Sequence, residues 1–151
     1  MIELKKLFIA LSLVSVLIVS ACGYKEYGDY TYMDFDHISH WSEVDDLGED
    51  DYELLYVYDR DFKGASCLGC EVVNERLFKF AKEGDHGKDV TFLNTREMTG
   101  SRPPHIEDRA PRLYIIKDQK ALEVYSSAQE IFEFIDQFED GDFSWPEPSS
   151  E

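Results

Sequence analysis

Cys67 and Cys70 stand where one kind of secondary structure is expected to give way to another. Residues 54–58 form a short run of aliphatic and aromatic residues, which is typical of a buried strand. From Cys67 onward, apolar residues recur with helical spacing. Unpaired N–H groups and the helix dipole stabilise a thiolate at the start of a helix. The position of this pair therefore favours thiol–disulfide exchange.

A structural cross-link is the first alternative for the two cysteines. In the chain-entropy model, a bridge that closes about four residues stabilises a fold by only about 2 kcal/mol, against about 4–5 kcal/mol for a loop of about a hundred residues. A chain of 151 residues can also bury a core without such a bridge. A cross-link that closes so short a loop would add little stability, but this alternative stays open.

Metal binding is the second alternative, because two thiolates at this spacing supply half of a tetrahedral zinc site. There is no second cysteine pair, so the other ligands would come from His37, His40, His86 and His105. Covalent haem attachment needs a histidine directly after the second cysteine, where this chain has Glu71. We therefore expect neither a metal nor a bound cofactor.

Residues 1–21 have the organisation of an export signal. Two lysines precede an uncharged apolar run, residues 7–19, which is shorter than the roughly 20 residues of a transmembrane helix. The run ends in Val19-Ser20-Ala21-Cys22, which resembles the lipobox of bacterial lipoproteins. The resemblance implies cleavage before Cys22 and a lipid anchor on its sulfur, on the extracytoplasmic face of a membrane. The alternative is an uncleaved anchor or an ordinary signal peptide, and either would still export the domain.

Lipidation would leave a simple set of cysteines. If Cys22 carries lipid, only Cys67 and Cys70 remain of the three, and an oxidising compartment would pair them with each other.

Without residues 1–21, which include Glu3 and two lysines, the chain has 13 Lys and Arg against 31 Asp and Glu, a net charge of −18. Such an acidic surface excludes nucleic acid as a partner, since binding phosphates needs a basic footprint.

The remaining pattern predicts one folded domain at residues 38–139, after an acidic, tyrosine-rich tether at 22–37 and before a loose tail at 140–151. A helix is possible between residues 37 and 47, where apolar residues recur at helical spacing. Ser127 and Glu130 have the spacing of a capping box for the last helix. The predicted elements are strands at 53–58, 90–94, 112–117 and 121–125, and helices from residue 67 to about 82 and from Ser127 to Phe138.

A strand, a helix and a second strand in this order predict parallel pairing, whereas the tight turn at 118–120 predicts an antiparallel hairpin. The chain resembles the thioredoxin superfamily through Cys67-Leu68-Gly69-Cys70 and Ala110-Pro111. The resemblance implies an α/β, three-layer fold with a mixed four-stranded sheet and helices on both faces. It also implies that Pro111 is a cis-proline lying against the disulfide, and that Ala110 presents backbone groups to the partner.

The resemblance implies that Cys67 attacks a disulfide in an exported protein and that Cys70 resolves the mixed disulfide. Exported proteins with thiols or disulfides, and a membrane electron donor or acceptor, would be the partners. Glu71, Asp59 and Asp61 would disfavour a thiolate, whereas Arg109 or Arg112 would oppose them. No histidine lies between the cysteines, which favours a reductase or general exchange protein over a strong oxidant. The alternative function is a redox-inert binding module that uses the Pro111 face.

Overall fold

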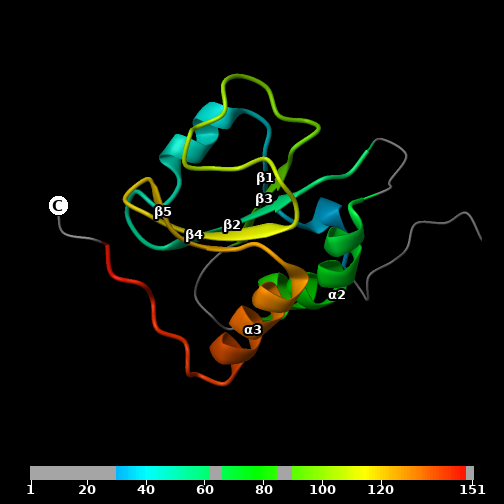
Figure 1. Cartoon of the computed structure of the whole chain (residues 1–151), viewed down its shortest axis with the longest axis vertical. Helices are drawn as coiled ribbons and strands as arrows, with labels where there is room; N and C mark the ends of the chain where they lie inside the picture. Colours follow the sequence, from blue (N-terminus) through cyan, green and yellow to red (C-terminus); the bar gives the residue numbers. More distant parts are fainter. Residues whose placement is uncertain (1–29, 62–65, 85–89, 149–151) are drawn as a thin grey trace, which may run out of the picture.

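The computed structural model describes residues 30–61, 66–84 and 90–148 (Figure 1). A five-stranded sheet forms the centre of the described part, with two α-helices on one side of it. In chain order the elements are η2 (Tyr32–Asp34), β1 (His37–Ile38), η3 (Trp41–Asp46), β2 (Glu53–Tyr58), α2 (Leu68–Glu83), β3 (Val90–Asn94), β4 (Arg112–Lys117), β5 (Lys120–Tyr125) and α3 (Ala128–Glu139).

The strands lie in the order β1-β3-β2-β4-β5. The first three are parallel to one another, whereas β4 is antiparallel to both β2 and β5. The mixed sheet confirms the predicted pairing, but it has five strands instead of four. The additional strand, β1, is two residues long and pairs with the outer side of β3. A segment this short is below the length at which an alternating pattern can be recognised.

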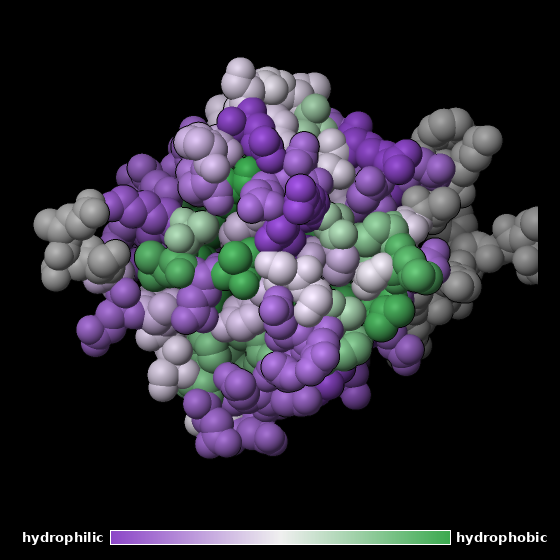
Figure 2. Space-filling model, viewed as in Figure 1, coloured by the Kyte–Doolittle hydropathy of each residue, from purple (hydrophilic) through white to green (hydrophobic). Residues whose placement is uncertain are grey.

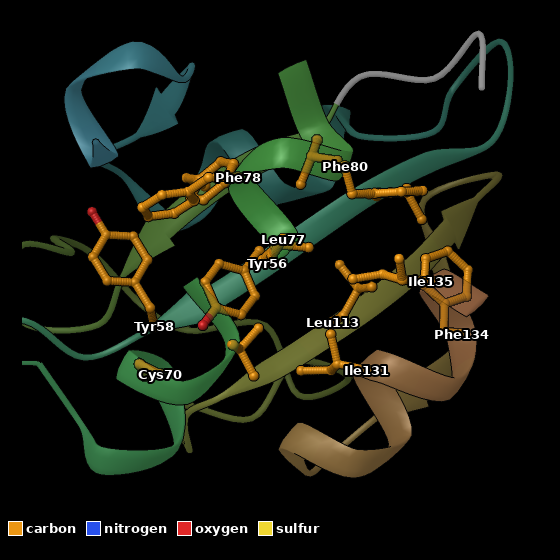
Figure 3. Packing of buried hydrophobic residues seen from close by; sticks show 14 of the residues in the cluster. Tyr56, Tyr58, Cys70, Leu77, Phe78, Phe80, Leu113, Ile131, Phe134 and Ile135 are labelled. Carbon is orange, nitrogen blue, oxygen red and sulfur yellow. The ribbon is translucent and has the colours of Figure 1, made fainter. Parts of the chain in front are cut away.

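Alternate residues of the strands face α2 and α3, which pack together on one face of the sheet (Figure 3). Tyr56 and Leu113 are among the residues that the sheet contributes, and Leu77 and Phe134 among those from the helices. All four are at most 1% exposed. Burying a large apolar side chain contributes about 1.5–3 kcal/mol, so this layer is the main source of stability.

The other face of the sheet is covered by η3 and the segment before β4 (Figure 1). Trp41 and Val44 of η3 pack on Leu55 and Tyr114, and Ile106 adds to the same cluster. The helix predicted between residues 37 and 47 is therefore a short 3-10 helix. Both α-helices lie on one face of the sheet, and the helix on the other face is the 3-10 helix η3. The predicted helices on both faces are present in this form.

The folded part begins before residue 38 and continues beyond residue 139. Tyr32, which was expected in the tether, is 4% exposed and belongs to the cluster beneath α2. Phe143 and Trp145, expected in a loose tail, pack against Phe138. Trp145 also stacks on Tyr52 at 4.8 Å between ring centroids. Aromatic contacts hold both flanking segments to the domain, so the predicted boundaries enclose too few residues.

The predicted signal peptide and Cys22 lie outside the described residues. Within the described residues, no helix combines the length and the apolar character that crossing a membrane would require.

Candidate functional site

Cys67 and Cys70 form a disulfide, with their Cα atoms 5.0 Å apart. Cys67 is the N-cap of α2, and its Sγ accepts a hydrogen bond from the backbone N–H of Cys70 at 3.0 Å. Cys70 is fully buried, whereas Cys67 is only partly buried. The pairing and its place at the helix start agree with the sequence analysis. The two cysteines therefore differ in exposure, and Cys67 is the more accessible one.

Backbone contacts from the end of β2 hold Cys67 in place. The N–H of Cys67 donates to the carbonyl of Asp59 at 2.9 Å, and Arg60 forms an antiparallel bridge with Ser66. The buried side chain of Asn94 holds Arg60 through two hydrogen bonds, accepting from its N–H at 3.1 Å and donating to its carbonyl at 3.0 Å. The sequence analysis missed Asn94, although an amide at the end of a buried strand was the available signal.

Pro111 lies against Gly69, the second of the two residues between the cysteines. A Cβ atom added to Gly69 would stand 2.7 Å from Cδ of Pro111. The Ala110–Pro111 peptide is cis, and both residues are partly exposed. Antiparallel pairing of β4 with β2, which places Arg112 opposite Val57, brings this segment to the disulfide end of the sheet. Pro111 therefore lies beside the turn that carries the disulfide, and the functions of Pro111 and Ala110 stay predictions.

Arg112 stabilises the segment that leads to Pro111. Its guanidinium donates to a carboxylate oxygen of Glu107 at 2.7 Å and to the hydroxyl of Ser126 at 2.6 Å. The hydroxyl of Tyr114 accepts from the N–H of Glu107 at 3.0 Å, and burial raises the pKa of this tyrosine. Arg112 is therefore occupied by these partners on the side of the sheet away from Cys70, while Arg109 is exposed.

The acidic residues near Cys67 differ in their surroundings. Asp59 forms an ion pair with Arg96, so its charge is matched locally. Glu71, in the first turn of α2, is partly exposed. Solvent and a paired cation both weaken the effect of a carboxylate on a neighbouring thiol. These observations reduce the expected repulsion from Asp59.

A layer of polar and aromatic side chains lies under the disulfide end of α2. Tyr32 stacks on Tyr58 at 4.1 Å and donates its hydroxyl proton to Oδ1 of Asn74 at 2.8 Å. The hydroxyl of Tyr58 is 2.8 Å from Nε2 of His37, and burial raises the pKa of Tyr58. The guanidinium of Arg60 lies 5.0 Å from the centre of the Tyr32 ring. The sequence analysis missed this layer, although Asn74 is a polar residue within the apolar stripe of α2.

Two large apolar side chains in the first turns of α2, close in sequence to Cys67, are exposed. Leu68, which follows Cys67, is 81% exposed, and Val72 one turn further along α2 is 54% exposed. Figure 2 shows apolar atoms gathered over the first turns of α2. Large apolar side chains in such positions are typical of surfaces that contact other molecules.

The described residues contain no group of three or more metal-binding side chains placed to hold an ion. Both thiols of the zinc alternative are in the disulfide, and His37 contacts the carbonyl of Phe35 and the hydroxyl of Tyr58. His86 lies outside the described residues.

Solved structures of thioredoxins are similar to this chain. The thioredoxin of Malassezia sympodialis, Mala s 13, has a TM-score of 0.50 and 14% identity, over 69% of this chain and 90% of its own. Thioredoxin f2 of Chlamydomonas reinhardtii has a TM-score of 0.48 and 12% identity, over 73% and 99%. Plasmodium falciparum thioredoxin has a TM-score of 0.49 and 11% identity, over 68% and 97%. No protein-family model and no curated protein matches the sequence. At this identity the likeness to Mala s 13 concerns the fold, which is thioredoxin-like.

Proposed function

We propose that this protein is a thiol–disulfide oxidoreductase, tethered to the outer face of a membrane, that exchanges disulfides with exported proteins through Cys67 and Cys70. The observation that carries the proposal is the asymmetric disulfide at the start of α2. Cys67 is partly exposed, Cys70 is buried, and Pro111 lies against the turn between them. A cross-link that only stabilised the fold would not need this arrangement.

Cys67 is the nucleophile in this mechanism. After reduction of the pair, the N–H of Cys70 and the N-terminus of α2 would stabilise negative charge on the Cys67 sulfur. The Cys67 thiolate attacks one sulfur of the partner's disulfide. A mixed disulfide forms, and the other sulfur of the partner leaves as a thiolate that takes up a proton. Leu68 and Val72 would contact apolar side chains beside the attacked disulfide.

Cys70 completes the exchange. As a thiolate it attacks Sγ of Cys67, which forms the Cys67–Cys70 disulfide and breaks the bond between Cys67 and the partner. The partner's second sulfur leaves as a thiolate and is protonated, so two electrons pass from the protein to its partner. A membrane electron donor would then reduce the disulfide for the next cycle.

Exchange in the reducing direction is the role that we propose, because no histidine lies between Cys67 and Cys70. The reduction potential of the pair tests this direction. A potential near that of thioredoxin, about −270 mV, supports a reductase, whereas one near about −120 mV would identify an oxidant.

The membrane tether is a separate part of the proposal and is supported by Val19-Ser20-Ala21-Cys22. Substituting Cys22→Ala in the full chain should move the protein from the membrane fraction to the soluble or unprocessed fraction. Metabolic labelling with a fatty acid should mark the wild type and not the variant. Labelling that persists in the variant contradicts lipidation at Cys22.

The redox function is tested by reduction of a disulfide-containing protein substrate with wild type, Cys67→Ser and Cys70→Ser. We expect turnover from the wild type alone, and a stable covalent adduct between the Cys70→Ser variant and its partner. Equal rates for wild type and Cys67→Ser would contradict the oxidoreductase and support the redox-inert binding module instead. Isolating the adduct from the cell envelope would identify the partner.

A further inference from the structure

One buried polar side chain, that of Asn74, lies one helical turn beyond Cys70 in α2. The side chain of Asn74 is fully buried, and its Oδ1 accepts from the hydroxyl of Tyr32 at 2.8 Å. Its Nδ2 has no hydrogen-bond partner among the described residues. A buried donor without a partner costs about 1–3 kcal/mol, and such groups are uncommon in native proteins. The disulfide form of the protein therefore keeps an unused amide donor inside its core.

This donor lies one helical turn from the resolving cysteine. Residues four positions apart share a face of a helix, so Asn74 follows Cys70 on the buried side of α2. Both side chains are 0% exposed. Figure 3 shows Cys70 in the same packed layer as Tyr56 and Tyr58. The buried cluster that contains Cys70 is mainly apolar, and it includes Val73, Leu77 and Leu113.

Resolution of a mixed disulfide requires a thiolate at Cys70. Apolar burial raises the pKa of a thiol because the anion loses its hydration. The N–H of Cys70 in the first turn of α2 donates to Cys67, whereas no group among the described residues donates a hydrogen bond to the sulfur of Cys70. A buried anion at Cys70 therefore needs a donor from a nearby side chain.

We propose that in the reduced protein Nδ2 of Asn74 donates a hydrogen bond to the Cys70 thiolate and thereby speeds its attack on the mixed disulfide. The inference rests on the proposed function and identifies a further residue for the resolving step. In that step Cys70 forms a bond to Sγ of Cys67, the bond from Cys67 to the partner breaks, and the partner leaves with the electron pair as a thiolate. Tyr32 holds Oδ1 of Asn74, which fixes the orientation of the amide.

Most other polar and charged groups near Cys70 already contact other partners. The hydroxyl of Tyr32 donates to Asn74, and that of Tyr58 contacts His37. The charged neighbours are Asp59, which pairs with Arg96, Arg60, which lies over the Tyr32 ring, and the partly exposed Glu71. From β4 and α3 the cluster receives Leu113, Ile115, Ile131, Phe134 and Ile135, none of which titrates. The hydroxyl of Tyr56 is the competing donor, and a variant must test it separately.

The test is single-turnover reaction of the reduced protein with an aromatic disulfide that releases a coloured thiolate. A first release reports attack by Cys67, and a second reports resolution by Cys70. We expect Asn74→Leu to slow the second release about tenfold at neutral pH, the effect of a rise of about one unit in the pKa of Cys70, and to leave the first unchanged. The difference should disappear at a pH above the thiol pKa of the variant, which a purely structural defect would not produce.

Further variants separate the donor from its surroundings. Asn74→Asp keeps an acceptor for Tyr32 and replaces the donor by a negative charge, so it should slow resolution more than Asn74→Leu. Tyr32→Phe should slow it less, because the amide remains but is no longer held. Tyr58→Phe is the matched control, since it removes a hydroxyl that contacts His37, and it should stay within about twofold of wild type.

The thiol of Cys70 can also be titrated directly by thiolate absorbance in a Cys67→Ala variant, where Asn74→Leu should raise its pKa. The inference is overturned if this pKa is unchanged, or if both folded Asn74 variants resolve within about twofold of wild type. A slow second release in Tyr56→Phe, together with normal Asn74 variants, also overturns it. The titration needs no partner, so it tests Asn74 even if wild type fails to exchange disulfides and the proposed function is wrong.

Discussion

Gly69 and Pro111 approach each other so closely that no side chain fits between them. A Cβ atom on Gly69 would lie 2.7 Å from Cδ and 3.1 Å from Cγ of Pro111. These ring atoms are attached to the backbone of the segment before β4, so they cannot rotate away as the end of a long side chain could. The contact fixes the distance between the turn of the disulfide and the strand that follows Pro111.

Substituting Gly69→Ala should therefore destabilise the oxidised protein. Overpacking of this kind typically costs about 1–3 kcal/mol, because a backbone segment must move. Urea unfolding of the oxidised wild type and variant measures the difference. Leu68→Ala is a suitable control, since its side chain is 81% exposed and its loss should change stability by less than about 0.5 kcal/mol. Equal stabilities for Gly69→Ala and wild type would contradict the close contact.

Leu68 should contribute to the binding of partner proteins. Its exposed side chain follows Cys67 directly, so a bound partner would cover it. We expect Leu68→Ser to raise KM for a protein disulfide about threefold to tenfold, the effect of losing roughly 1 kcal/mol of apolar contact, with little change in kcat. Val124→Ser is the control, because Val124 is 43% exposed on the edge strand β5, which β4 separates from β2. An unchanged KM for Leu68→Ser would remove this surface from the docking site.

The buried tyrosines predict loss of stability at alkaline pH. Burial raises the pKa of Tyr58 well above its ordinary value of 10.0, and burial and the neighbouring Glu123 do the same for Tyr125. Above about pH 10 the unfolded chain loses these protons while the folded protein keeps them, so the free energy of unfolding falls as pH rises. Below that pH the contribution is fully present.

Urea unfolding between about pH 8 and about pH 11 measures this loss. Tyr58→Phe should show a shallower decline than wild type, because one of the raised pKa values has been removed. A decline of equal slope in wild type and Tyr58→Phe would show that Tyr58 ionises normally in the folded protein.

The segment after α3 should stabilise the fold without affecting the redox reaction. Trp145 stacks on Tyr52, whose hydroxyl donates to the carbonyl of Pro146 at 2.8 Å. Tyr52 immediately precedes β2, at the end of the strand opposite to the disulfide. Trp145→Ala should cost about 1–3 kcal/mol, less than a fully buried tryptophan, and leave the reaction with a synthetic disulfide unchanged.

Thermal unfolding followed by circular dichroism measures the effect of Trp145→Ala. Ser144→Ala, in the neighbouring exposed position, is the matched control and should unfold like wild type. A Trp145→Ala variant as stable as wild type would support the loose tail that composition predicts. A slower redox reaction would instead link this segment to the disulfide.

The sequence predicts the centre of the fold well, for a physical reason. The bounds of β2, β3 and β4 match the predicted strands, because each contains a mainly apolar run between turn residues. Ser127 caps α3 as predicted, but the carboxylate of Glu130 accepts from the N–H of Ser126 and not of Ser127. Local patterns specify such elements because few other arrangements can bury the same side chains.

The remaining features depend on contacts between distant residues. Tyr32 lies in an acidic, tyrosine-rich segment that resembles a linker, and only its packing beneath α2 makes it part of the core. Asn74 breaks an apolar stripe, but its importance depends on Tyr32, which lies 42 positions away. The position of the disulfide was predictable, whereas the polar layer beneath it was not, because no periodic pattern connects its members.

The bridge between Arg60 and Ser66 has a consequence for how this molecule can vary. Asn94 holds Arg60 before this stretch, and the hydrogen bond from Cys67 to Asp59 holds the chain after it. The number of residues between Arg60 and Ser66 therefore does not determine where Cys67 stands. Relatives could lengthen or shorten this stretch and keep the same chemistry, which makes it a natural place to evolve, or to engineer, a new choice of client.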